Sequence, residues 1–277
     1  MEVRYPAVAG MFYNGDPGSL RKHLDRLFSG TGKDDYLCVI SPHAGYEYSG
    51  KTAAFAINSM RPGKRFIILG PNHTGFGSEF SVMSSGKWRT PLGDCVIDSG
   101  LAGELMKCKV LDEDLYAHER EHSIEVQLPF LQHRFKRFTF VPITIMGMGY
   151  SDEFLHRCEI LGKAIAKAIK SDPDVRAIAS SDFSHYISAE SAKRKDEKAT
   201  EKIMELDADG FFGTLRDTDA SVCGYAPIAV LLSAAKSLGL NRVKLIDYTT
   251  SGDRTGDKRS VVSYSAIGFG KTNGKKQ

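Results

Sequence analysis

Ser180-Ser181-Asp182-Phe183-Ser184-His185-Tyr186 is the segment of this 277-residue chain that indicates its architecture most clearly. It follows an apolar run, residues 175–179, that has the length and composition of a buried strand. A strand that ends in small hydroxyl residues followed by Asp-x-x-His places an acid and an imidazole on one loop. In an open α/β sheet, ligands bind beyond the carboxyl ends of the strands. The stretch therefore predicts a functional site at one edge of a sheet.

Three further stretches resemble this one. The apolar run 37–40 leads into Ser41-Pro42-His43-Ala44-Gly45, and the run 66–69 leads into Gly70-Pro71-Asn72-His73-Thr74-Gly75. The third, Val222-Cys223-Gly224-Tyr225, lies just before a long apolar helix. We expect two histidines, one cysteine and the Asp/His pair to meet at the same edge of the sheet.

Segments typical of strands and helices alternate along the chain. Apolar periodicity predicts strands over 36–40, 65–69, 80–83, 138–145, 175–180, 243–250 and 261–269, and helices over 20–28, 49–60, 101–108, 123–131, 151–171, 188–206, 208–214 and 227–238. The alternation predicts an α/β fold with a mixed, mostly parallel central sheet flanked by helices, and an antiparallel last pair of strands. Trp88, beside a Thr-Pro-Leu-Gly turn, fits a hairpin better than a pocket wall. No repeat or linker is visible, so we expect residues 1–277 to form a single domain.

Composition excludes several classes of function. The net charge is only +3 and positive charge is dispersed, so a nucleic-acid partner is not expected. The five cysteines are scattered, without a CxxC pair, which indicates a reducing compartment and no disulfide framework. The N-terminus lacks the apolar core of a signal peptide, and no apolar stretch reaches the length of a bilayer. We expect a cytoplasmic protein without a membrane partner.

His43, His73 and Cys223 are the candidate metal ligands. Each histidine follows a predicted strand and is flanked by Pro and Gly, which fix the backbone and permit close approach. One such histidine alone is usually a polar surface residue, but two in the same context favour a shared ion, because imidazole is the commonest metal ligand. Cys223 is followed by Gly224 and a helix start, where the helix dipole favours thiolate. This donor set suits iron(II), zinc or copper and leaves one coordination position open.

Asp182 and His185 are the candidate acid/base pair. Three residues apart, they are expected to lie on one side of a turn and to hydrogen-bond, so that the carboxylate orients the imidazole. The alternative is that Asp182 only caps the next turn. Because Ser123 resembles a helix N-cap, His122 is expected at a helix entry, where a role in the pocket and no role are about equally supported. His118 is expected on the surface.

The same residues resemble the motifs of the Memo family. The matching pieces, in order along nearly the whole chain, are Ala9-Gly10-Met11-Phe12-Tyr13, Pro42-His43-Ala44-Gly45-Tyr46, Gly70-Pro71-Asn72-His73, Glu121-His122-Ser123-Ile124-Glu125-Val126-Gln127-Leu128-Pro129-Phe130, Ser180-Ser181-Asp182-Phe183-Ser184-His185-Tyr186 and Cys223-Gly224.

Memo-family proteins resemble class III extradiol dioxygenases, non-haem iron enzymes with the LigB-like fold. The resemblance implies that His43 and His73 are the metal histidines and that Cys223 stands where the dioxygenases have a carboxylate. It implies that His185, with Asp182, matches one catalytic histidine and that His122 matches the other. Fe(II) is the implied metal, with copper or zinc as alternatives. Thiolate is oxidised more readily than carboxylate, which argues against ring cleavage itself.

The resemblance also implies partners. Eukaryotic Memo proteins resemble adaptors that bind phosphotyrosine peptides. Microbial members accompany a radical-SAM protein and an AMMECR-type protein, an association known as AmmeMemoRadiSam, whose substrate is unknown.

Three functions are compatible with these residues. In the first, which the chemistry favours, the chain is a redox enzyme whose metal activates dioxygen or a substrate while His185 and His122 move protons. In the second, the same pocket is a non-catalytic binding module for a phosphotyrosine-like peptide, a small molecule or a partner protein. In the third, zinc-bound water performs hydrolysis with the same ligands.

Overall fold

Four parallel strands form the centre of the fold in the computed structural model, which describes residues 2–272. They are β2 (Cys38–Ser41), β9 (Val175–Ser180), β3 (Arg65–Asn72) and β8 (Thr139–Met146), in that spatial order. Their sequences are nearly continuous apolar runs, as expected for parallel strands that are covered on both faces.

The sheet continues on both sides of this parallel centre. Beyond β8 lie β6 (Gly93–Ile97), β5 (Lys87–Thr90) and β1 (Val3–Arg4), and the short strands β4 (Phe80–Val82) and β7 (Asp112–Glu113) join at the end of β8. Beyond β2, the antiparallel β12 (Val261–Gly270) pairs with both β11 (Arg242–Thr250) and β10 (His185–Ile187). The predicted α/β class, with its mixed and mostly parallel sheet, is confirmed.

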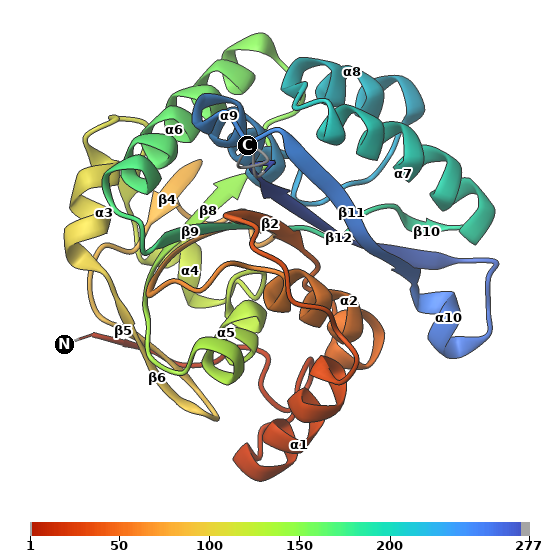
Figure 1. Cartoon of the computed structure of the whole chain (residues 1–277), viewed down its shortest axis with the longest axis horizontal. Helices are drawn as coiled ribbons and strands as arrows, with labels where there is room; N and C mark the ends of the chain where they lie inside the picture. The colour runs from red at the N-terminus through yellow and green to blue at the C-terminus, as the bar shows by residue number, and fades with distance from the viewer. Residues whose placement is uncertain (1, 273–277) are drawn as a thin grey trace, which may run out of the picture.

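Helices cover the two faces of the sheet, as Figure 1 shows. Side chains alternate along each strand, so Cys38 and Ile40 enter one core while Val39 enters the other. One face carries α3 (Ser99–Met106), α6 (Asp152–Ser171), α7 (Ala189–Met204), α8 (Ala208–Thr218) and α9 (Tyr225–Leu238), and the other carries α1 (Pro17–Phe28), α2 (Tyr46–Asn58) and α5 (Leu128–Phe135). The short elements α4 (Tyr116–Glu119), η1 (Glu125–Gln127) and α10 (Ser251–Thr255) lie in connections.

Most predicted elements occur within a few residues of the expected bounds. Asp16 and Ser151 cap their helices through side-chain oxygens. Trp88 lies in the β5–β6 hairpin with 0% of its surface exposed, so the hairpin interpretation is confirmed. The prediction that Ser123 caps a helix is wrong: its hydroxyl donates to the Pro71 carbonyl, 2.8 Å away. Within residues 2–272, no helix is long and apolar enough to cross a membrane.

The register of the parallel strands determines where the site lies. Ser41 of β2 is directly opposite Ser180 of β9, and Leu69 of β3 is opposite Ala179. The loops that follow these three strands therefore leave the sheet at one edge, which is the carboxyl edge where ligands bind in such folds.

A buried ion pair fastens the N-terminal segment to this edge. The Arg4 guanidinium pairs with the Glu125 carboxylate, and both side chains are almost fully buried. Glu125 also accepts from the backbone amides of Ala7 and Val8, at 2.7 and 3.1 Å, and from the Tyr13 hydroxyl at 2.6 Å. The aromatic N-terminal stretch thus packs on the body of the protein.

Glu125→Gln should lower the free energy of unfolding by about 3–5 kcal/mol, because it leaves the Arg4 charge buried without its counter-ion. The exposed Glu119→Gln is the control and should cost less than about 0.5 kcal/mol. Urea unfolding of the two variants measures both values. Equal stability of the two variants would show that the pair is not needed to hold the segment.

Candidate metal centre

The carboxyl edge of the sheet brings the three candidate ligands together. His43 follows β2, His73 follows β3 directly, and Cys223 lies in the turn before α9. The His43 Nε2 and Cys223 Sγ atoms are 3.2 Å apart, and one ligand atom from each of the three residues lies within 4.8 Å of the others. His43 is buried, Cys223 is partly buried, and the His73 side chain is 35% exposed.

Gly224 allows Cys223 to approach the sheet. A Cβ atom at position 224 would lie 2.4 Å from the Ser180 carbonyl oxygen and 2.5 Å from the Ser181 Cβ, which is closer than real atoms come. The Gly224 amide donates instead to the Ser181 hydroxyl, at 3.0 Å. A side chain here would push the thiol away from the end of β9.

The ring of His43 is held by a buried polar network. Its Nδ1 atom lies 2.9 Å from the Ser180 hydroxyl oxygen. That hydroxyl donates its only hydrogen to the Ser123 carbonyl, at 2.6 Å, and accepts from the Gln127 amide at 2.9 Å. The same Gln127 nitrogen donates to the Pro42 carbonyl at 2.8 Å, so the atom of this amide that faces Ser180 is the nitrogen and not the oxygen.

The network determines the tautomer of His43. Because the Ser180 hydrogen is already given to a carbonyl, Nδ1 of His43 must carry a hydrogen and donate it to Ser180. The lone pair of the neutral ring is then on Nε2, the atom that faces Cys223. A metal-ligating histidine is usually oriented in this way, by a hydrogen bond at its other nitrogen.

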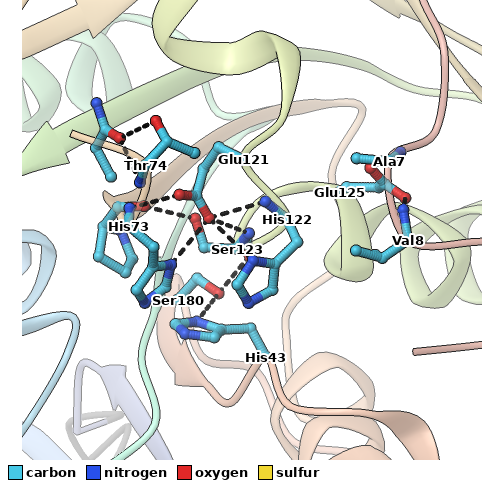
Figure 2. Close-up of polar contacts among 12 residues, drawn as sticks. Ala7, Val8, His43, His73, Thr74, Glu121, His122, Ser123, Glu125 and Ser180 are labelled. Atoms are coloured by element: carbon cyan, nitrogen blue, oxygen red, sulfur yellow. Dashed lines mark hydrogen bonds and ion pairs between the residues drawn. The ribbon is translucent and has the colours of Figure 1, made fainter. Parts of the chain in front are cut away.

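Glu121 plays the same part for His73 (Figure 2). Its fully buried carboxylate accepts from His73 Nδ1 at 3.0 Å and from the backbone amides of His73, His122 and Ser123. The Nε2 of His73 is therefore also free to bind. With four donors around it, Glu121 acts as the orienting carboxylate of His73, although it also lies within ligand distance of His73 and His122.

Burial and neighbouring charges shift the protonation of the site. Burial lowers the pKa of His43 well below its usual value, and the histidines nearby lower it further, so its ring is neutral. Burial also lowers the pKa of His73, but the Glu121 hydrogen bond and charge outweigh it and raise that pKa overall. Burial and the Asp182 charge raise the pKa of the Cys223 thiol, which is therefore protonated when no cation lies beside it.

Asp182 and His185 are placed near the site but do not pair as predicted. The Asp182 carboxylate accepts from the His43 backbone amide at 2.8 Å, and the Asp182 amide donates to the Cys223 sulfur at 3.3 Å. His185 donates from Nδ1 to the Ser221 carbonyl, at 2.8 Å. The expected helical turn is absent, because residues 182–184 are irregular and His185 begins β10. Burial raises the pKa of Asp182.

His122 lies in the site, whereas His118 does not. The His122 ring stacks on that of His73, with centroids 4.9 Å apart, and meets that of His43 at 5.6 Å. Phe12 from the N-terminal segment packs on its edge, at 4.8 Å. The prediction that His118 is a surface group is wrong: it is 0% exposed, beside Trp88, and burial lowers its pKa to about 3.

The donor set suits a transition metal. Two imidazole nitrogens and a thiol within 4.8 Å are compatible with one ion, because bonds of about 2.0–2.3 Å place neighbouring ligands roughly 3–4 Å apart. Nitrogen and sulfur ligands favour iron, zinc or copper over magnesium or calcium. His43, His73 and Cys223 are thus a candidate metal site.

A family model described as Memo-like protein matches residues 4–268 of the chain. The chain belongs to the Memo family. The family resemblance inferred from the motifs is therefore confirmed, over nearly the whole chain.

Archaeal relatives agree with this assignment. A MEMO1 family protein of Methanosarcina mazei is 45% identical over 272 residues, covering 96% of this chain and 99% of its own. One of Methanopyrus kandleri is 42% identical, covering 96% and 98%. Among solved structures, an uncharacterized protein from Escherichia coli K12 matches at 13% identity and a TM-score of 0.48, and the match covers 82% of this chain and 98% of that one.

Sequence analysis gave no role to Glu121, Gln127 or Ser180. A signal was present, because Glu121, Glu125 and Gln127 interrupt an apolar run that includes Ile124, Val126 and Leu128. Polar side chains inside such a run are expected to be buried and hydrogen-bonded to a specific partner. The hydrogen-bond partners that these side chains have outside their own segment come from segments 48 or more residues away, and the local sequence pattern does not identify them.

Ser180→Ala should weaken Co(II) binding by about 10–100-fold, because the His43 ring loses the acceptor that holds Nδ1. The thiolate-to-cobalt absorption band reports both binding and the Cys223 ligand. Ser59→Ala is the control, since it removes another buried hydroxyl, bonded to the Ala56 carbonyl far from the site. Unchanged affinity in Ser180→Ala would mean that the Nδ1 bond does not orient the ring.

Proposed function

We propose that this Memo-family chain is a metal-dependent redox enzyme with a pocket like that of the non-haem iron dioxygenases. His43, His73 and Cys223 would hold iron(II), with copper or zinc as alternatives. The observation that carries the proposal is the distance of 3.2 Å between His43 Nε2 and Cys223 Sγ. The His43 ring is held in this orientation by the hydrogen bond between its Nδ1 atom and the Ser180 hydroxyl. A bound iron supplies electron transfer and activation of dioxygen or substrate. A LigB-like fold and a cytoplasmic location belong to the same proposal.

His185 is the residue we assign to proton transfer. Its Nδ1 is committed to the Ser221 carbonyl, so Nε2 is the atom that can accept or return a proton. The His185 side chain is partly exposed, and a positive charge on it would lower the pKa of both His43 and Asp182. His122, packed between His73 and Phe12, would be the second acid/base group.

Asp182 has a different part in this proposal from the one predicted. It holds the His43 backbone through its carboxylate and supports the Cys223 sulfur through its amide. It would therefore act as a positioning residue for two ligands, not as the partner of His185.

One observation favours the binding-module alternative. Tyr186, next to His185, has a φ of 59° and is 79% exposed. A bulky residue in this region is strained, and such strain is often kept where a ligand is contacted. A phosphotyrosine-like peptide or a partner protein would meet this ring first. The radical-SAM and AMMECR-type proteins remain proposed partners on family grounds.

Metal content is the primary test of the proposal. Anaerobically purified wild-type protein from iron-supplemented cells should hold about one iron per chain, and Cys223→Ser should lose most of it. Cys108→Ser is the control, because Cys108 is a free, partly buried cysteine outside the site. Absence of any transition metal from the wild type would contradict the redox proposal and favour the binding module.

His185→Gln should lower the oxygen-consuming turnover of catechol-type substrates by about 10²–10⁴-fold, because a general acid/base is lost. Its iron content should stay at the wild-type level, since His185 is not a proposed ligand. Oxygen-electrode rates and elemental analysis on the same samples separate the two effects. If iron-loaded wild type turns over no catechol, or if His185→Gln is as active as wild type, the assignment fails.

A further inference from the structure

The turn before α9 is hydrogen-bonded to the segment that follows β9. At one end of this turn the Cys223 sulfur accepts from the Asp182 amide, at 3.3 Å. At the other end, two residues earlier, Ser221 accepts two hydrogen bonds from His185. One turn therefore carries a candidate metal ligand and the contacts of the residue that we assign to proton transfer.

Ser221 holds both the backbone and the ring of His185. Its hydroxyl oxygen accepts from the His185 amide at 2.9 Å, and its carbonyl oxygen accepts from His185 Nδ1 at 2.8 Å. A carbonyl has no hydrogen to give, so the neutral ring must carry its hydrogen on Nδ1 and its lone pair on Nε2. The hydroxyl bond keeps the His185 backbone beside Ser221, and so keeps the ring within reach of the carbonyl.

The backbone of Ser221 is itself fixed. Its two neighbours, Ala220 and Val222, are 3% and 2% exposed and belong to the same core as α9. The Ala220 amide donates to the Leu215 carbonyl of α8, at 3.1 Å. Because the chain is anchored on both sides of Ser221, this residue presents its carbonyl and hydroxyl oxygens in a fixed position.

The strand that carries His185 provides little constraint of its own. β10 has three residues, and among the described strands it pairs with β12 alone (Figure 1). The register shifts between His185 and Ile187, and Tyr186 between them has a φ of 59°. Within residues 2–272, no residue other than Ser221 hydrogen-bonds to the His185 ring. The orientation of this ring therefore depends on Ser221.

We propose that Ser221 is the positioning residue of His185, and that it keeps the ring in the tautomer whose Nε2 can accept a proton. The consequence for catalysis rests on the proposed function, in which His185 transfers protons, whereas the positioning of the ring does not. A base must lie within hydrogen-bond reach of the proton that it takes, and a displacement of about 1 Å can cost about 100-fold in rate.

The first measurement needs neither metal nor substrate. A long-range proton–nitrogen NMR spectrum of the metal-free full chain, labelled with ¹⁵N-histidine, reports which ring nitrogen carries the hydrogen. It is recorded at about pH 8.5, where histidine rings are neutral, and His185→Gln identifies the signals. Wild type should show His185 protonated at Nδ1. In Ser221→Ala the two nitrogen shifts should move toward each other, as in a mixture of tautomers, and Ser221→Thr should keep the wild-type shifts.

The second measurement is turnover by the iron-loaded full chain. Ser221→Ala should lower kcat for a catechol-type substrate about 10–100-fold and leave KM within about twofold, because the acid/base group is displaced while substrate binding is kept. Ser221→Thr should restore the rate, and all variants should hold as much iron as wild type. The bond from the His185 amide lies at the surface, so water can replace the lost hydroxyl and Ser221→Ala should fold.

Ser85→Ala is the control, because it removes another exposed serine hydroxyl, in the connection between β4 and β5, and it should match wild type in both measurements. Unchanged nitrogen shifts in Ser221→Ala, or a wild-type ring protonated at Nε2, would overturn the positioning role. An altered tautomer with unchanged kcat would overturn its consequence for catalysis. If iron-loaded wild type shows no turnover while Ser221→Ala still alters the tautomer, the proposed function fails and the positioning role stands.

Discussion

Burying a carboxylate without hydrogen-bond donors is among the most costly events in folding, and this constraint organises the site. Glu121, Glu125, Asp182 and Asp196 are the buried carboxylates among residues 2–272. Each collects donors from segments that are distant in the sequence. Glu121 holds the loop after β3, Glu125 holds the N-terminal segment, and Asp182 holds the loop after β2. Asp196 of α7 accepts from Ser184, Tyr248 and Ser263 and so fixes the residue before His185. Loss of any one carboxylate would leave its buried donors unpaired and loosen the segment that it holds.

The positions of the helices and strands follow from local sequence patterns, so they could be predicted from the sequence. Parallel strands covered on both faces are continuous apolar runs, helices carry apolar stripes and capping residues, and each pattern lies within a short window. The placement of His43 and His73 beyond strands was readable for the same reason. The hydrogen-bond partners of Ser180 could not be predicted, because they come from three other segments of the chain, at Ser123, Gln127 and His43. A hydroxyl at the end of a strand can bond to many different groups, and the packing of the sheet determines which of them lie within reach of Ser180.

The two wrong predictions about histidine have physical causes. His118 lies among charged residues, which is typical of a surface, but Arg4 turns inward over Trp88 and donates to the His118 carbonyl, so the segment is buried. The Asp182–His185 pair failed because spacing of three residues brings side chains together only in a helical turn. Here the chain extends into β10, whose antiparallel pairing with β12 begins at His185. The spacing of two residues predicts a contact between their side chains only when the local backbone conformation is also predicted correctly.

The three candidate metal ligands are held unequally, and their different exposure indicates which side of the site is open. His43 is buried and fixed on its backbone and its Nδ1, whereas the His73 side chain is 35% exposed and Cys223 is partly buried. His185 and Tyr186 lie on a short, exposed strand at the outer end of the sheet. The hydrogen bonds behind His43 pair every group of the network, so displacement of these groups would leave donors unpaired. Under the proposed function, a ligand would reach the site from its exposed side, where His73 and His185 lie. Tyr186 next to His185 has a φ of 59°, a conformation that glycine adopts readily and a tyrosine adopts only at a cost, so the surrounding structure must stabilise it.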